Sequence, residues 1–246
     1  MNFNLANCLI GLSCIIGGYL FGSIPNGVLI GRIFFHKDPR DYYSHNSGGS
    51  NVGRVFGKKI GVLVIFLDAV KTMTPLFSAY AALTFIPGAA EYLDYGGYDA
   101  TALWYWTAGV SALLGHCFPV YLGFKGGKAV SSFVGLFIAF AYIPVAVFAS
   151  VFFITLFKKK IVSISSILAS ACASISLFVL VLGLYLGGVL TEVGPYLTWA
   201  FGAPYLSFGF EAAAACLLSA AILILRHLPN IKRLREGTEN TVKWIK

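Results

Sequence analysis

Charged side chains are scarce in this chain of 246 residues, since Asp, Glu, Lys and Arg make up only 11% of the sequence. A soluble domain carries about 25% of such residues, so the chain lacks the polar surface that a soluble globule needs. Hydrophobic residues make up 58%, which excludes a disordered chain. The five cysteines are scattered and form no C-x-x-C pair. Neither a disulfide framework nor a metal site is therefore expected.

Long apolar runs are what the chain has instead, and its mean hydropathy is +0.79. A membrane-spanning helix needs about 20 predominantly apolar residues. The runs therefore predict an all-α polytopic membrane protein, with one domain over residues 1–246. The first run contains Gly22-Ser23-Ile24-Pro25, where proline is expected to break the helix. The apolar runs lie at about 5–35, 60–87, 102–120, 129–157, 161–187 and 203–225.

The distribution of Lys and Arg predicts the orientation in the membrane. Two connecting segments, 86–110 and 187–204, contain neither residue. Loops rich in Lys and Arg stay in the cytoplasm, so the loops 88–101 and 188–202 are expected outside. The basic segments 36–59, 121–128, 158–160 and 226–246 are expected inside. One crossing before residue 36 then places the N-terminus outside and the C-terminus in the cytoplasm.

The apolar run 129–157 joins two basic segments, Lys125–Lys128 and Lys158–Lys160, that the charge pattern places on the same side. The run must therefore enter the membrane and return, and Pro144 near its middle is the expected turning point. Each arm would have about 14 residues, or about 21 Å of helix, which is short for a core of about 30 Å. With this short helix pair around Pro144 counted as two, about seven transmembrane helices are expected.

The first cluster of polar residues lies at 44–54. Hydroxyls, carboxamides, glycine backbone and an arginine suit an oxyanion better than a cation or an apolar ligand. An ordinary solvated loop, which also needs Ser, Asn and Gly for its turns, is the alternative. The candidate residues are Ser44, Asn46, Ser50, Asn51 and Arg54.

The second cluster is Lys125-Gly126-Gly127-Lys128, which opens a helix at Ala129 with Ser132 behind it. Paired glycines would let backbone N–H groups approach a phosphate, and the helix N-terminus and two lysines would add positive charge. The segment is not a Walker A loop, because Leu122 stands where that motif needs glycine. Anchoring by positive charge explains the lysines but not the glycines between them.

The third cluster is at the end of the last span, where His227 is followed one turn later by Asn230. Histidine is the residue type that ordinarily titrates near neutrality. A basic juxtamembrane tail is the alternative interpretation. Lys160 and Ser163 form a minor polar set after the lysine triplet, where capping of a helix explains the serine equally well.

Three further groups of ionisable residues lie outside these clusters. Asp68 and Lys71, spaced i,i+3 within the second span, are expected to form a structural ion pair. The H-x4-D pair of 36–41 matches a motif of thioester-dependent acyltransferases, but no partner motif follows and a catalytic role is not expected. Glu211 in the last span has no evident partner in the sequence.

Four segments together resemble the acyl-phosphate:glycerol-3-phosphate acyltransferases, the PlsY family of bacterial membrane enzymes. The G-S-I-P of 22–25 is similar to the break in that family's first helix, and 44–54 to its S-G-N-x-G-A-T-N-x-x-R loop. The segment 115–128 resembles its G-H-x-F-P-V…F-K-G-G-K, and 227–239 its H-R-E-N-I-x-R-L…G-T-E. The departures from the family pattern include His45 and Ala129 in place of glycine, Gly49 in place of alanine, and Ser50 in place of threonine.

The resemblance implies transfer of a fatty acyl group from acyl phosphate to the sn-1 hydroxyl of glycerol 3-phosphate. The products would be lysophosphatidic acid and phosphate, as in phospholipid synthesis, with no CoA, carrier protein, cofactor or metal. It also implies a multi-pass protein of the bacterial cell membrane whose active site faces the cytoplasm. No nucleic acid is expected as a partner, and an association with an enzyme that produces acyl phosphate stays open.

The same resemblance implies roles for the clusters. Ser44, Asn46, Ser50 and Arg54 would bind the acyl-phosphate head group, while Lys125–Lys128 would bind the phosphate of glycerol 3-phosphate. His227 and Asn230 would orient the acceptor, and either His227 or a substrate phosphate would accept the proton. The expected catalytic residues are Ser44, Arg54, Lys128, His227 and Asn230. Asn51, Ser132, Lys160 and Ser163 complete the expected substrate-binding set.

Two other classes of protein fit the composition. A transporter for a phosphorylated solute would need anion-binding groups at the midplane or on both faces, whereas the expected outer segments carry only acidic residues. A lipid-binding scaffold would leave the spacing of glycines, serines and asparagines without a purpose. An enzyme is therefore the preferred prediction.

Overall fold

The computed structural model describes residues 5–94, 97–138, 141–193, 197 and 208–242. Within these ranges the regular secondary structure is helical, and Asp94 and Asp99 form an isolated β-bridge. The chain divides into two compact units, Met1–Leu136 and Phe137–Lys246. The α-helices are α1 (Leu5–Gly22), α2 (Asn26–Phe35), α3 (Gly49–Phe56), α4 (Lys58–Phe85), α5 (Thr101–Cys117), α6 (Val130–Ile138), α7 (Tyr142–Lys159), α8 (Val162–Leu186), α9 (Leu190–Val193), α10 (Phe210–Arg226) and α11 (Leu228–Arg235), and the short 3₁₀ turns include η1 (Pro39–Asp41), η2 (Ala90–Tyr92) and η3 (Val120–Leu122).

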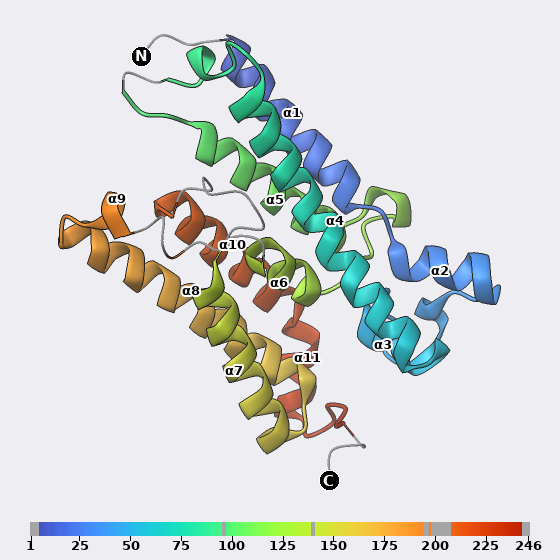
Figure 1. Ribbon diagram of the computed structural model, residues 1–246. Helices are drawn as coiled ribbons and strands as arrows, with labels where there is room; N and C mark the ends of the chain where they lie inside the picture. Colours follow the sequence, from blue (N-terminus) through green and yellow to red (C-terminus); the bar gives the residue numbers. More distant parts are fainter. Residues whose placement is uncertain (1–4, 95–96, 139–140, 194–196, 198–207, 243–246) are drawn as a thin grey trace. The chain divides into compact units, whose positions relative to one another are not determined.

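In the first unit, α1 packs along α5, and α4 packs against both helices (Figure 1). Glycines allow this close approach, because a Cβ at Gly18 would overlap the carbonyl of Ala108 and a Cβ at Gly22 would overlap that of Ala112. Small residues at a helix contact are typical of membrane proteins, where backbones must approach closely to gain packing energy. The pairing of α1 and α5 therefore depends on the absence of side chains at these positions.

The first apolar run is broken where the sequence predicts. Helix α1 ends at Gly22 and α2 begins at Asn26, with Pro25 between them. The carbonyl of Pro25 accepts hydrogen bonds from the N–H groups of Val28 and Leu29, at 3.0 and 2.9 Å, and so starts the second helix. Proline is tolerated here because its missing N–H falls outside the hydrogen-bonded part of α2.

Helix α3 lies against the start of α4 (Figure 1). A Cβ built on Gly49 would lie 2.7 Å from the carbonyl oxygen of Gly61, and one built on Gly61 would lie 2.6 Å from the Cα of Gly53. Three glycines therefore hold the two helices at backbone contact. This contact positions Ser50, Asn51 and Arg54, which α3 carries.

In the second unit, α7 and α10 both pack on α8. The buried face of α8 is built from alanine and serine, and the Ser174 hydroxyl donates a hydrogen bond to the Cys216 carbonyl of α10 at 3.1 Å. Helix α10 ends at Arg226 and α11 follows at an angle of 53°. Glu211, unexplained in the sequence, lies in the first turn of α10, where the helix dipole favours a negative charge.

The prediction of a multi-pass membrane protein is confirmed. Among the described residues, four helical spans, formed by α1 with α2, α4, α7 and α8, are long and apolar enough to cross a membrane, and α10 with α11 makes up to five. The run 129–157 is divided into two helices as expected, but they are unequal and α7 already starts at Tyr142. Pro144 was expected at the turn and instead lies in the first turn of α7, where proline is favourable. The count of seven helices and the orientation of the termini stay predictions.

Candidate active site

Asn51 is the centre of the first polar loop. Its side chain is buried, with 2% exposed, and makes five hydrogen bonds within the chain. Its Nδ2 donates to the carbonyls of Pro39, Tyr42 and Asn46 at 2.7, 3.2 and 2.9 Å. Its Oδ1 accepts from the N–H and the hydroxyl of Ser44 at 3.1 and 2.9 Å. Asn51 therefore fixes the place of Ser44 and the path of the loop before α3.

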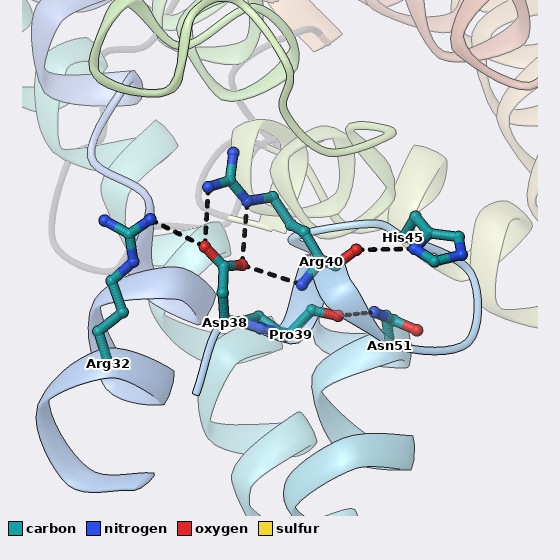
Figure 2. Close-up of polar contacts among 6 residues, drawn as sticks. All are labelled: Arg32, Asp38, Pro39, Arg40, His45 and Asn51. Atoms are coloured by element: carbon teal, nitrogen blue, oxygen red, sulfur yellow. Dashed lines mark hydrogen bonds and ion pairs between the residues drawn. The ribbon is translucent and has the colours of Figure 1, made fainter. Parts of the chain in front are cut away.

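Asp38 supports the same loop from its other end, as Figure 2 shows. Its carboxylate accepts hydrogen bonds from the backbone N–H, Nε and Nη2 of Arg40 at 2.9, 3.0 and 2.8 Å, and from Nη2 of Arg32 at 3.0 Å. The hydrogen bond from the Arg40 side chain is the main cause that lowers the pKa of Asp38 from 3.8 to about 2. The carboxylate is therefore charged at every physiological pH.

His45 has a left-handed backbone, with φ at 52°. Its Nδ1 lies 2.8 Å from the carbonyl oxygen of Arg40 (Figure 2). Since a carbonyl can only accept, the ring carries its proton on Nδ1. The left-handed backbone conformation costs a residue other than glycine about 1–2 kcal/mol. The hydrogen bond of the His45 ring offsets part of that cost.

Ser50 and Arg54 lie one turn apart on α3 and both are exposed. Residues at i and i+4 share a helix face, so the hydroxyl and the guanidinium are presented together. Ser44 and Asn46 are half-buried in the preceding loop. The predicted residues of the first cluster are thus presented by a loop and a helix that Asn51 joins.

The segment Lys125–Lys128, called the glycine loop below, is held by the end of α5. The N–H of Gly127 donates to the carbonyl of His116 at 3.0 Å, and the N–H of Gly126 donates to that of Cys117 at 3.2 Å. These two N–H groups were expected to face a phosphate, and in the structure they hold the loop in place instead. The charged groups in this segment are Lys125, which is exposed, and Lys128, which is half-buried.

Ala129 follows the loop with φ at 63° and is fully buried. Helix α6 begins at the next residue, one position after the predicted start. The Ser132 hydroxyl in its first turn lies 3.4 Å from the carbonyl oxygen of Asp68, to which it donates. Ser132 is therefore engaged with α4.

A small cavity lies between the first polar loop and the end of α5. Its volume is about 10 Å³, which is the size of one water molecule. It lies beside the predicted ion pair, which is confirmed by a distance of 3.1 Å between Lys71 Nζ and Asp68 Oδ1. Ser47 of the first loop and His116 of α5 line the same cavity. Because the carbonyl of His116 accepts the N–H of Gly127, His116 lies between this cavity and the segment Lys125–Lys128.

Glu239 is the corresponding centre in the second unit. Its Oε1 accepts hydrogen bonds from Asn230 Nδ2 at 2.7 Å and from the Ser163 hydroxyl at 3.0 Å, and its Oε2 accepts from Arg233 Nε at 2.7 Å. Partial burial acts to raise the pKa of Glu239, but the hydrogen bonds from Asn230, Arg233 and Ser163 together outweigh it and lower that pKa. Gly237, with φ at 69°, turns the chain back after α11 so that Glu239 can reach these partners.

His227 and Asn230 lie at the junction of α10 and α11, and both are buried. His227 Nδ1 lies 2.8 Å from the Leu223 carbonyl, so a neutral ring carries its proton on Nδ1 and its lone pair on Nε2. Among the described residues, the buried Oδ1 of Asn230 has no hydrogen-bond partner. Such an acceptor is costly unless something donates to it, which suits a group that receives a substrate hydroxyl.

Lys160 ends α7 in a left-handed conformation, with φ at 55°. Its carbonyl accepts a hydrogen bond from the N–H of Val242 at 2.7 Å. The C-terminal segment is therefore fastened to the junction of α7 and α8 that carries Lys160 and Ser163.

The H-x4-D pair does not form a site in this structure. His36 ends α2 and Asp41 belongs to η1, and both residues are exposed. Asp38, which lies between them, makes the ion pairs of this segment instead.

These features define a multi-pass helical membrane protein that carries hydroxyls, carboxamides and cations of an anion-binding kind on loops at helix ends. The family model described as glycerol-3-phosphate acyltransferase matches residues 12–237. The chain belongs to the glycerol-3-phosphate acyltransferase family, and it is an acyltransferase. The transporter and the scaffold that the composition also allowed are therefore set aside.

Individual relatives agree with this assignment. The glycerol-3-phosphate acyltransferase of Staphylococcus haemolyticus is 35% identical over 94% of this chain and 97% of its own, and that of Streptococcus pneumoniae is 31% identical over 96% and 95%. Two crystal structures of PlsY (YgiH), an integral membrane glycerol 3-phosphate acyltransferase, are similar in fold. The lysophosphatidic acid form has a TM-score of 0.66 and the glycerol 3-phosphate form 0.65, each at 28% identity over 94% of both chains.

Three residues of the site region were not selected from the sequence, namely Asp38, His116 and Glu239. The signal for Asp38 was its position between two arginines, a spacing that allows one carboxylate to bind both. His116 and Glu239 lie in segments that resemble the family motifs. The ion-pair partner of His116, Asp68, and one partner of Glu239, Ser163, are distant in sequence and leave no local pattern.

Proposed function

We propose that this enzyme transfers a fatty acyl group from acyl phosphate to the sn-1 hydroxyl of glycerol 3-phosphate. The hydroxyl oxygen attacks the acyl carbon, the bond from that carbon to the phosphate oxygen breaks, and inorganic phosphate leaves. Lysophosphatidic acid is the other product. Acyl phosphate is a mixed anhydride and is already activated, so the protein has to hold two anions in register and stabilise the developing oxyanion.

The observation that carries this proposal is the link through His116 in the first unit, where His116 lines a cavity with Ser47 of the loop 44–54 and its carbonyl accepts the N–H of Gly127. The loop 44–54 with α3 and the segment Lys125–Lys128 supply the cations Arg54, Lys125 and Lys128 within this unit. The two substrates bring up to about four negative charges at neutral pH. Phosphate recognition by Arg and Lys is the chemistry that such a set of cations performs.

For the acyl-phosphate head group, we assign binding to Ser44, Asn46, Ser50 and Arg54. The guanidinium of Arg54 suits two oxygens of one phosphate, and Ser50 shares its helix face. Ser44 donates to the Asn51 side chain, and its lone pairs are fixed in direction as a result. Asn51 is proposed to act by holding Ser44 and Asn46 in place, and direct contact of Asn51 with substrate stays a prediction.

For the phosphate of glycerol 3-phosphate, we assign binding to the segment Lys125–Lys128. The lysines supply charge, and Gly126 and Gly127 let the segment lie close to α5. The first turn of α6 adds the partial positive charge of a helix N-terminus. Ser132 in that turn is engaged with α4, so we propose that it fixes the start of α6.

In the second unit, we assign orientation of the acceptor to His227 and Asn230. The carboxamide oxygen of Asn230 would accept the hydroxyl hydrogen bond, and Nε2 of His227 would take the proton. Lys160 would offset part of the negative charge of the substrates. Ser163 donates to Glu239, so its proposed part is to hold the carboxylate that orients Asn230.

The protein is proposed to lie in the plasma membrane of a bacterium with these loops at the cytoplasmic face. The loop 44–54 and the segment Lys125–Lys128 must then be accessible from the same side. Single cysteines in place of Ser50 and Lys125 should both resist a membrane-impermeant thiol reagent added to intact cells, and both should react after permeabilisation. Reaction of either one from outside would contradict this orientation.

The decisive test of the reaction uses purified protein in lipid, labelled glycerol 3-phosphate and palmitoyl phosphate, with palmitoyl-CoA as the control donor. Lysophosphatidic acid should form only with palmitoyl phosphate, with one phosphate released for each acyl group transferred. The product should carry its acyl group on the sn-1 oxygen. Product from palmitoyl-CoA alone would overturn the donor assignment and return attention to His36 and Asp41.

A further inference from the structure

A buried polar cluster lies behind the glycine loop, and the reaction proposed above does not use it. Asp68 and Lys71 of α4, Asn26 of α2 and His116 of α5 meet there. Asp68 Oδ1 accepts from Asn26 Nδ2 at 3.1 Å and lies 3.1 Å from Lys71 Nζ. The side chains of Asp68, Lys71 and His116 are only 3%, 7% and 5% exposed. Buried charges at membrane depth are costly unless they are paired, and they usually have a function.

Part of this cluster belongs to the break in the first span. Lys71 Nζ donates to the carbonyl of Ile24 at 2.7 Å, and Asn26 is the first residue of α2. The cation thus lies beside the end of α1, where a helix is partially negative, while Asp68 faces the start of α2, where a helix is partially positive. Each charge of the ion pair therefore lies beside the helix end of opposite partial charge at the break between α1 and α2.

The remaining partner of Asp68 points toward the glycine loop. His116 Nδ1 lies 3.7 Å from Asp68 Oδ1, which is a contact between a carboxylate and a ring N–H edge and too long for a hydrogen bond. On its other side, the ring lies directly against Gly127, because a Cβ at Gly127 would overlap Nε2, Cε1 and Cδ2 of the imidazole. The ring is thus packed between the buried carboxylate and the loop.

The backbone of His116 holds the same loop. Its carbonyl accepts the N–H of Gly127, and a Cβ at Gly126 would overlap this carbonyl oxygen. Both glycines are therefore explained by their approach to His116. This contact also fixes the backbone positions from which the side chains of Lys125 and Lys128 extend, at the two ends of the loop.

We propose that Asp68 and His116 are positioning residues for the loop Lys125–Lys128. The carboxylate orients the imidazole ring, and the ring supports the two glycines so that the flanking lysines meet the phosphate of glycerol 3-phosphate. This inference rests on the proposed function of the loop. Neither residue has to touch a substrate, and their effect is on the binding of one substrate only.

The first experiment separates positioning from general stability by steady-state kinetics. Asp68→Asn and His116→Asn should each raise the KM for glycerol 3-phosphate at least tenfold, while the KM for palmitoyl phosphate changes less than twofold. Thr74→Val is the matched control on α4, because the Thr74 hydroxyl is exposed and donates only within its own helix, to Val70. It should change neither KM. A lower kcat with both KM values unchanged, or an equal rise in both, would overturn the proposal.

The second experiment does not depend on Asp68→Asn folding correctly. Gly127→Ala should raise the KM for glycerol 3-phosphate at least tenfold, because its methyl group overlaps the His116 ring. In a His116→Ala background the same substitution has room and should change that KM less than threefold. Sites that do not interact give equal factors in both backgrounds, and equal factors here would show that the ring does not support the loop.

Lys125→Gln distinguishes a failure of this inference from a failure of the proposed function. If Lys125→Gln leaves the KM for glycerol 3-phosphate unchanged, the phosphate assignment is wrong and the positioning role falls with it. If Lys125→Gln raises that KM while the variants of Asp68 and His116 do not, only the positioning role is wrong.

Discussion

The carboxylate of Glu239 and the carboxamide of Asn230 are joined by a hydrogen bond of 2.7 Å, from Asn230 Nδ2 to Glu239 Oε1. Since the amide nitrogen faces Glu239, the Asn230 oxygen faces the opposite way, and it is this oxygen that lacks a partner among the residues described. The acid therefore sets the direction in which Asn230 can accept a hydrogen bond. Both residues lie within the second unit, nine positions apart.

Glu239→Gln should destabilise the protein and lower kcat. An amide presents one oxygen where Glu239 has two acceptors, so either Arg233 or the pair Asn230 and Ser163 would face an N–H₂ group. The loss is expected at about 1–3 kcal/mol, or a fall in Tm of several degrees in detergent. Glu236→Gln is the control, because Glu236 makes only an exposed pair with Lys232 at 3.9 Å and should change Tm very little. Equal effects of the two variants would contradict the role of Glu239.

His227→Gln tests the acceptor of the proton. If Nε2 of His227 takes the proton, the variant should lose about 10²–10⁴ in kcat and the acidic limb of its pH–rate profile should disappear. The measurement is kcat against pH with saturating palmitoyl phosphate. A variant that keeps the normal profile would show that a substrate phosphate accepts the proton instead.

Ala129→Gly should stabilise the protein, because Ala129 has φ at 63°. A left-handed conformation costs about 1–2 kcal/mol for a residue with a Cβ, and the added freedom of glycine in the unfolded chain offsets about 0.5–1 of that. A net gain of up to about 1 kcal/mol is expected in thermal unfolding. Ala108→Gly within α5, where the backbone is helical, should instead lower stability. A loss of stability with Ala129→Gly would argue against the left-handed assignment.

Asp38→Asn should reduce stability by about 1–2 kcal/mol at pH 7, since it removes charged hydrogen bonds with Arg40. The pKa of Asp38 is lowered in the folded protein, from 3.8 to about 2. The stabilisation is therefore complete above about pH 4 and is lost as the pH falls through 2. Thermal unfolding of both proteins from pH 7 to pH 2 should show Tm values that converge only below pH 4. Convergence already at pH 5 would contradict the Arg40 contact.

Arg32→Gln serves as the control for Asp38→Asn. The Arg32 side chain is 60% exposed, and exposed ion pairs contribute only about 0–1 kcal/mol. Its substitution should therefore lower Tm by less than half of the effect of Asp38→Asn.

The membrane spans were predictable because each one is a continuous apolar run, and the break at Gly22–Pro25 was predictable because proline and glycine act locally. The turn between α6 and α7 was misplaced for a related reason. Proline both ends helices and begins them, and the sequence around Pro144 does not distinguish the two. Pro75 lies inside α4 without ending it, which shows the same ambiguity.

The residues of the candidate site stay predictions, and most of the contacts that hold them in place could not be predicted from the sequence. Ser44, Arg54 and the lysines carry chemistry that a sequence displays directly. The engagement of the Gly126 and Gly127 N–H groups depends on carbonyls of α5, and the five bonds of Asn51 go mainly to backbone atoms. Every residue carries the same backbone carbonyl, whatever its side chain. No pattern of side chains in the sequence could therefore have indicated these backbone partners.

The order of synthesis gives the pairing of Lys71 with Ile24 a further consequence. A lone ion at the centre of a bilayer costs about 2.5–3.5 kcal/mol during insertion, and α4 has to bring in both a cation and an anion. Ile24 and Asn26 leave the ribosome before Asp68 and Lys71 do, so the carbonyl and the carboxamide that hydrogen-bond to these two ions are already made when α4 enters the lipid. The break between α1 and α2 thus offers hydrogen-bond partners that lower the free energy of inserting the charged helix α4 into the membrane.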